Sequence, residues 1–211
     1  MPLKLNSSGG GAVTFDVPST ASTYTLTAPA VNDTLVTKTS TDTLTNKTLT
    51  SPTINGMSSS ILTQMTAVTL TNQTSVDFTG IPSWAKRITL MLSGVSTSST
   101  GLMRFRSGTS GGLATSGYRG AVGGGSTTNF SVGFDSAGDN GAAYLRSGAI
   151  QFYYSGSGNT WCCLGAYALE ANAFVYTFQG AVTLSGVLDR VSMTTTSTDF
   201  FDAGVVNLMY E

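Results

Sequence analysis

The sequence predicts an all-β protein in which an extended N-terminal β region is followed by an antiparallel β-sandwich. Short runs of alternating apolar and polar residues recur along the chain, and clusters of Gly, Ser, Asn and Asp separate them. Runs of this kind, with turn residues between them, are the pattern of short strands. Only 10% of the 211 residues are charged, and a chain rich in Thr, Gly and aromatic residues suits pleated sheet better than helix surfaces.

Residues 1–56 are predicted to be a separate N-terminal stalk region. Two alternating stretches, residues 12–17 and 24–28, predict short strands. In residues 41–54 apolar side chains come only about every fifth position, so this segment cannot bury enough apolar area to offset its ordering entropy. If it is ordered, it must pack against copies of itself or against another protein, which predicts an oligomeric stalk.

Residues 57–211 are predicted to form a knob domain, a β-sandwich of jelly-roll-like form, because seven or eight short strand patterns follow one another with turns between them. Residues 161–173 also fit a helical spacing, but the flanking glycines and the surrounding period favour strands. The strand patterns are Val68–Leu70, Val76–Phe78, Ile88–Leu92, Ile150–Tyr154, Phe174–Phe178, Val182–Leu184, Val191–Met193 and Val206–Tyr210.

The reactive residue types argue against an enzyme. The chain has no His, which removes the commonest general base and the commonest metal ligand. The adjacent Cys162 and Cys163 fit opposite faces of a strand better than a disulfide. Asp135 and Asp139 resemble a calcium loop only faintly, because no closing Glu follows, and a plain turn is the better interpretation. We expect no catalytic residues, no metal and no cofactor. One alternative stays open: two carboxylates that are distant in sequence can converge in space and form the catalytic pair of a glycosidase.

Charge and hydropathy also argue against nucleic acid and membranes as partners. A net charge of −1 argues against nucleic acid, because phosphate affinity comes from many Lys and Arg contacts. No apolar run approaches the roughly 20 residues of a membrane helix, so no membrane insertion is expected. The N-terminal residues lack the apolar segment of a signal peptide, which predicts synthesis in the cytoplasm.

Candidate binding residues lie in the Gly-rich interior between residues 97 and 180, which is expected to supply exposed loops. Arg and Tyr dominate recognition hot spots, since they give forked charge recognition or a large contact area. The alternative is that about half of the aromatic residues belong to the core and the arginines are simply solvated. The predicted receptor-binding residues are Arg104, Arg106, Tyr118, Arg119, Tyr144 and Arg146.

Several segments resemble known proteins. Residues 76–96, 184–195 and 201–211 strongly resemble parts of a C-terminal domain found in tail fibre proteins of tailed bacteriophages. The segment TLTNKTLTSPTI at residues 43–54 is similar to one that recurs in phage tail and virion proteins. Together these matches frame nearly the whole chain and leave residues 97–180 as a variable interior.

The resemblance implies a non-enzymatic structural virion protein, most simply a short homotrimeric tail fibre. It implies contacts with other virion proteins through residues 1–56, and with a host surface glycan or outer-surface protein through the knob. Only about 60 residues precede the knob, and a trimeric knob on so short a stalk also suits a capsid decoration protein, or head fibre. A polysaccharide-cleaving tailspike is a third, disfavoured alternative, because β-helix repeats and a carboxylate cluster are missing.

Overall fold

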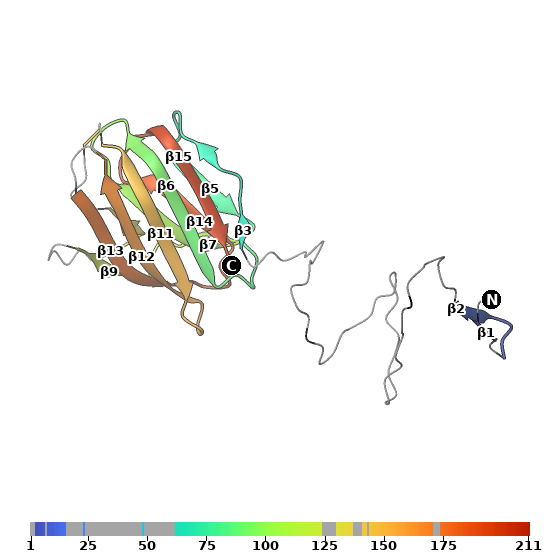
Figure 1. Cartoon of the computed structure of the whole chain (residues 1–211). Coiled ribbons are helices and arrows are strands. Elements are labelled where there is room, and N and C mark those ends of the chain that lie inside the picture. The colour runs from blue at the N-terminus through green and yellow to red at the C-terminus, as the bar shows by residue number, and fades with distance from the viewer. Residues whose placement is uncertain are drawn as a thin grey trace. The chain divides into compact units, whose positions relative to one another are not determined.

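The computed structural model describes residues 3–6, 8–15, 23, 48, 62–123, 130–136, 141–142, 144–170 and 174–211. The chain divides into two units, Met1–Thr53 and Ile54–Glu211, and each is considered by itself. Within the described residues every regular element is a strand, and all strand pairings are antiparallel (Figure 1). The predicted all-β class is therefore confirmed.

The described part of the first unit is a hairpin of β1 (Leu3–Asn6) and β2 (Ala12–Phe15). Its register places Leu3 opposite Phe15 and Asn6 opposite Ala12. Gly10 lies in the connection with φ of 84°, a conformation that glycine adopts without a Cβ penalty. The start of the strand predicted at residues 12–17 is confirmed, whereas the strand predicted at 24–28 and the stalk segment 41–54 lie outside the described residues.

The second unit contains two sheets, which we call the smaller and the larger sheet (Figure 1). The smaller sheet consists of β5 (Ser75–Thr79), β7 (Met103–Thr109), β8 (Gly112–Leu113), β10 (Phe134–Asp135) and β14 (Arg190–Thr195). The larger sheet consists of β3 (Thr63–Gln64), β4 (Val68–Thr69), β6 (Arg87–Thr97), β9 (Tyr118–Val122), β11 (Arg146–Tyr154), β12 (Thr160–Leu169), β13 (Phe174–Thr183) and β15 (Phe201–Tyr210).

The strand pairs are nested in the sequence. β11 pairs with β12, β9 pairs with β13 around them, β7 pairs with β14 around those, and β6 pairs with β15 around all three pairs. The smaller sheet has the order β10-β7-β14-β5, with β8 beside β7. The larger sheet has the order β3-β15-β6-β11-β12-β13-β9, with β4 beside β15. Strands that are distant in sequence therefore lie side by side.

The core lies between the two sheets, because each long strand turns alternate side chains inward. In β6, Ile88 and Leu90 are fully buried while Arg87 and Ser93 are exposed. Rings from the two sheets meet across the core: those of Phe105 and Phe178 stack with centroids 5.5 Å apart. This face-to-face packing of antiparallel sheets is sandwich-like.

Residues 160–169 form a strand, β12, and not a helix. Burial alternates along it, so that Trp161, Cys163 and Tyr167 face the core and Cys162 is exposed. The two cysteines are free and lie on opposite faces of the strand, as the sequence predicts. Burial raises the pKa of the Cys163 thiol well above its ordinary value, because desolvation disfavours the thiolate.

Candidate binding surfaces

Five of the six residues predicted for receptor binding lie on strands and not on loops. Arg104 and Arg106 belong to β7, Tyr118 and Arg119 to β9, and Arg146 to β11. The expectation of exposed loop positions is wrong for these five, because the glycine-rich stretch forms pleated strands with a period of two. Tyr144 precedes β11, and its side chain packs against the core while partly exposed.

Tyr118 is a core residue. Its side chain is only 4% exposed, and its ring meets that of Phe134 edge-on at 5.0 Å. The hydroxyl donates to the carbonyl of Ser107 at 3.1 Å and accepts from the Ser107 N–H at 3.0 Å. Tyr118 therefore ties β9 of the larger sheet to β7 of the smaller one.

Arg146 is fully buried, which corrects the expectation that it is exposed. It shares the inward parity of Ile150 and Phe152 in β11, and its guanidinium donates to the carbonyls of Tyr144 at 3.0 Å and Gly141 at 3.4 Å. Carbonyl acceptors satisfy part of the donor set of a buried guanidinium. Arg146 thus holds the chain that leads into β11.

Arg104 and Arg106 lie on the outer face of the smaller sheet, since they alternate with the buried Met103, Phe105 and Ser107. Arg104 makes a forked ion pair with Asp135 of β10, with Nε–Oδ1 at 2.6 Å and NH2–Oδ2 at 2.8 Å. This hydrogen-bonded carboxylate raises the pKa of Arg104. Asp135, considered above as a calcium ligand, is therefore the partner of an arginine.

Three residues of β14 continue this outer face, and the exposed Ser75, Asp77 and Thr79 of β5 lie opposite them. Ser192 lies directly opposite Arg106. Arg190 and Thr194 stand two positions to either side of Ser192, and alternate side chains of a strand share a face. We call the set Arg104, Arg106, Arg190, Ser192 and Thr194 the arginine face.

Polar atoms on the arginine face are buried without partners. Within the described part of the chain, Nε of Arg106 and Arg190 and the hydroxyls of Ser192 and Thr194 make no hydrogen bond. Ser192 is fully buried, and Arg190 still pairs with Asp189 at 3.2 Å through its NH2 group. Buried polar atoms normally find a partner, so these donors are suited to water or to the oxygens of a ligand. Guanidinium and hydroxyl groups together suit a carboxylate or a phosphate.

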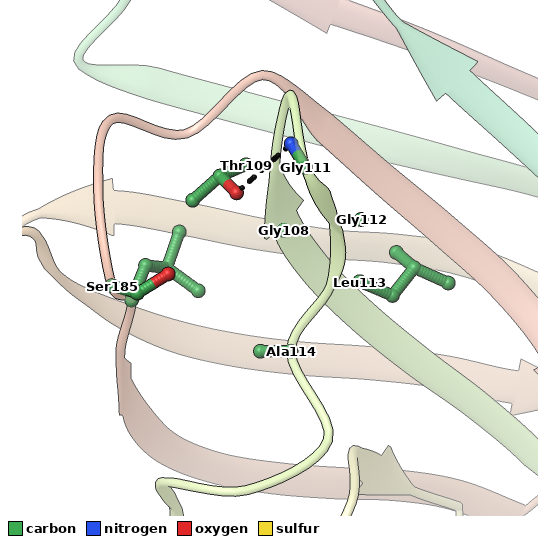
Figure 2. A pocket seen from close by; sticks show the side chains of 8 residues that line it. Gly108, Thr109, Gly111, Gly112, Leu113, Ala114 and Ser185 are labelled. Atoms are coloured by element: carbon green, nitrogen blue, oxygen red, sulfur yellow. Dashed lines mark hydrogen bonds between the residues drawn. The ribbon is translucent and has the colours of Figure 1, made fainter.

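A hollow of about 230 Å³ lies at the hairpin between β7 and β8, beside the chain that follows β13. Figure 2 shows that its wall consists of the hairpin backbone with the side chains of Thr109, Leu113 and Ser185 around it. The Thr109 hydroxyl accepts a hydrogen bond from the Gly111 N–H at 3.2 Å. The lining offers hydroxyls, backbone groups and apolar surface, but no titratable side chain. The hollow can hold a small uncharged group, but its own side chains supply no acid or base. The lining is Gly108, Thr109, Gly111, Gly112, Leu113, Ala114, Leu184 and Ser185.

A cluster of aromatic residues lies where β6 begins and β15 ends. Trp84 is 45% exposed and meets the ring of Tyr210 edge-on at 5.5 Å. The Lys86 ammonium lies 4.5 Å from the ring centroid of Tyr154, which in turn lies 5.5 Å from that of Trp161. The side chains of Lys86, Tyr154 and Trp161 help to line a small hollow of about 60 Å³. The sequence argument sought binding residues only between residues 97 and 180 and so missed Trp84, although a Trp after Pro82-Ser83 is a signal for an exposed turn position.

The described residues contain no group of three or more Cys, Asp or Glu side chains that could hold a metal ion. Over the same residues, no helix has the length and apolarity needed to cross a membrane. Comparisons of the chain with protein-family models, with curated proteins and with solved structures found no match.

Proposed function

We propose that the chain is a structural protein of a phage virion, a short homotrimeric tail fibre without enzymatic activity. In this proposal residues 1–56 attach to other virion proteins, and residues 57–211 form a jelly-roll-like knob that contacts the host surface. Support comes from the resemblance of residues 76–96 and 201–211 to fibre domains and from the nested antiparallel pairs, since jelly rolls are built from antiparallel strands in two packed sheets.

The observation that carries a binding role is the arginine face. It combines the guanidinium groups of Arg106 and Arg190 with two buried hydroxyls that lack partners among the described residues. An acidic group on a host surface glycan, a carboxylate or a phosphate, would bind the partly exposed guanidinium groups of this face. Three copies of the face in a trimer would strengthen weak single contacts by avidity, by a factor of about 10² or more where the geometry allows simultaneous binding.

The other predicted residues take different places in this proposal. Arg104 already pairs with Asp135, so in this proposal it helps to position the arginine face and does not itself bind the ligand. Arg119 is exposed on β9, and Tyr144 is partly exposed, so both stay candidates for contact with a receptor. Tyr118 and Arg146 are buried and would act on binding only through the fold.

The test is adsorption of particles to host cells after the arginine face is altered. The double variant Arg106→Gln and Arg190→Gln should lower the adsorption rate at least tenfold and reduce its dependence on salt, because charge recognition is screened by ions. Arg87→Gln is the matched control, since Arg87 is an exposed arginine of the larger sheet that pairs with Glu211. Thermal melting should show all variants folded. Unchanged adsorption of the double variant would refute this use of the arginine face.

The place on the particle is tested separately. An antibody raised against residues 57–211 should mark the tail in negatively stained particles. Label on the capsid surface would replace the tail fibre with the capsid decoration protein.

A further inference from the structure

The outer face of the larger sheet differs from the arginine face in its chemistry. Its outward-facing residues carry no charge over the middle of five neighbouring strands, from β15 through β6, β11 and β12 to β13, and the charged Arg87 and Asp202 lie outside this stretch, near the starts of β6 and β15. These residues, which we call the uncharged face, are Val205, Asn207, Met209, Thr89, Met91, Ser93, Ala149, Gln151, Tyr153, Cys162, Leu164, Ala166, Ala168, Val175, Thr177, Gln179 and Ala181.

Strand register makes this face continuous. Met91 is opposite Asn207 on one side and Ala149 on the other, and Ala149 is opposite Ala166. Large apolar side chains stand exposed on it: Leu164 is 39% exposed and Val175 is 68% exposed. An antiparallel sheet that faces water normally carries polar residues on that side. A broad uncharged face with exposed apolar side chains instead marks a surface that another protein covers.

The size of the face fits a stable interface. Five strands about 4.8 Å apart, with about five to seven residues each rising about 3.4 Å, span roughly 470 Å² before the relief of the side chains is counted. Specific interfaces bury about 800 Å² on each partner. The uncharged face therefore supplies roughly half or more of the area that each partner buries in a specific interface.

The chemistry of the face selects its partner. A charged partner would lose hydration of its ions against a surface that offers counter-charge only at its margins, which is unfavourable. A second copy of the same face brings no charge, and interfaces between identical subunits are depleted of charged residues and enriched in Met and aromatic residues. We propose that copies of this chain pack against one another through the uncharged face. This inference rests on the proposed function, because that function supposes a homotrimer.

The experiment uses the thiol of Cys162, which is exposed on this face in the single chain, two positions from Leu164. In the full-length oligomer, Cys162 should react with a disulfide reagent such as dithionitrobenzoate at least tenfold more slowly than in the variant Ala166→Arg. Gln151→Arg, which replaces a side chain that is already polar, should give the same acceleration and guards against misfolding of the first variant. Cys162→Ser assigns the signal, because Cys163 is buried in the core.

A matched control places the new charge elsewhere. Ser75→Arg puts an arginine at an exposed position of β5 in the smaller sheet and should leave the Cys162 rate unchanged. Light scattering of the wild-type chain should give about three times 21.8 kDa. A wild-type trimer in which Cys162 reacts as fast as in Ala166→Arg would overturn the interface while the fibre proposal stands. A wild-type monomer would overturn both.

Discussion

Tyr118→Phe removes a single oxygen from the contact between the two sheets. The Tyr118 hydroxyl accepts from the N–H of Ser107 at 3.0 Å and donates to the Ser107 carbonyl at 3.1 Å. The carbonyl keeps a second partner, the N–H of Ala114 at 2.9 Å. The Ser107 N–H has no other described partner, so the phenylalanine variant leaves a buried donor unpaired.

The expected loss follows from that unpaired donor. Leaving a buried hydrogen-bonding group without a partner costs about 1–3 kcal/mol of unfolding free energy. Tyr118→Ala also removes the ring contact with Phe134 and opens a cavity, so its cost should be larger, about 3–5 kcal/mol. Tyr153→Phe is the control, because its hydroxyl contacts only Gln151 on the outer face, at 2.9 Å. That variant should stay within about 0.5 kcal/mol of wild type.

Burial also raises the pKa of Tyr118, an effect that exceeds the lowering by hydrogen bonds with Ser107 and by the charge of Arg106. The folded chain then keeps the phenolic proton above pH 10.0, the ordinary value, while the unfolded chain loses it. The folded state binds more protons in that range, so stability falls as the pH rises above about 10. Tyr118→Phe should remove this part of the alkaline loss.

Urea unfolding followed by Trp fluorescence at pH 7 and pH 10.5 measures both effects, because Trp161 is buried in the same sandwich. Two results would refute the reasoning. One is a Tyr118→Phe variant as stable as Tyr153→Phe at pH 7. The other is a Tyr118→Phe variant that loses as much unfolding free energy between pH 7 and pH 10.5 as the wild type does.

Three further outcomes are expected. Gly165→Ala should destabilise by about 1–3 kcal/mol, because its Cβ would overlap the ring of Phe178; equal urea midpoints would contradict this packing. Arg104→Lys should lose about 1 kcal/mol, since lysine cannot fork onto the Asp135 carboxylate, and the loss should shrink in 1 M salt when unfolding is repeated there. Because burial raises the pKa of Cys163, stability should begin to fall above pH 9.0, and Cys163→Ala should lack this first step in a pH series of unfolding free energies.

Strand positions follow from the sequence, whereas their partners do not. The alternation of Ile88–Leu92 and Val206–Tyr210 predicts the inward faces of β6 and β15, since burial of one face requires a period of two. The two-residue strands such as β8 and β10 are too short to leave a period. The pairing of β6 with β15 depends on contacts across the whole sandwich, which local patterns do not contain.

The candidate site was predictable only in part, for the same reason. Arg104 and Arg106 stand out by residue type, but Ser192 reaches Arg106 only through the register of β7 and β14. Arg146 misled the sequence argument because a charged residue is normally exposed. The residues after it, Ser147 and Gly148, are too small to show which face of the strand is inward.

Nested pairing also sets the order in which the chain can fold. β6 cannot close against β15 until the polypeptide has been made as far as Phe201–Tyr210, and one hydrogen bond of this pair, from Ser96 to Asp202, spans 106 positions. Contacts between residues so distant in sequence form slowly. The long loop between the residues must lose conformational entropy before the new contacts can compensate for that loss. During that delay β6 is an open edge rich in apolar residues, the kind of segment that aggregates. Slow synthesis at low temperature should therefore favour soluble chains, and deletion of β15 should leave an insoluble product.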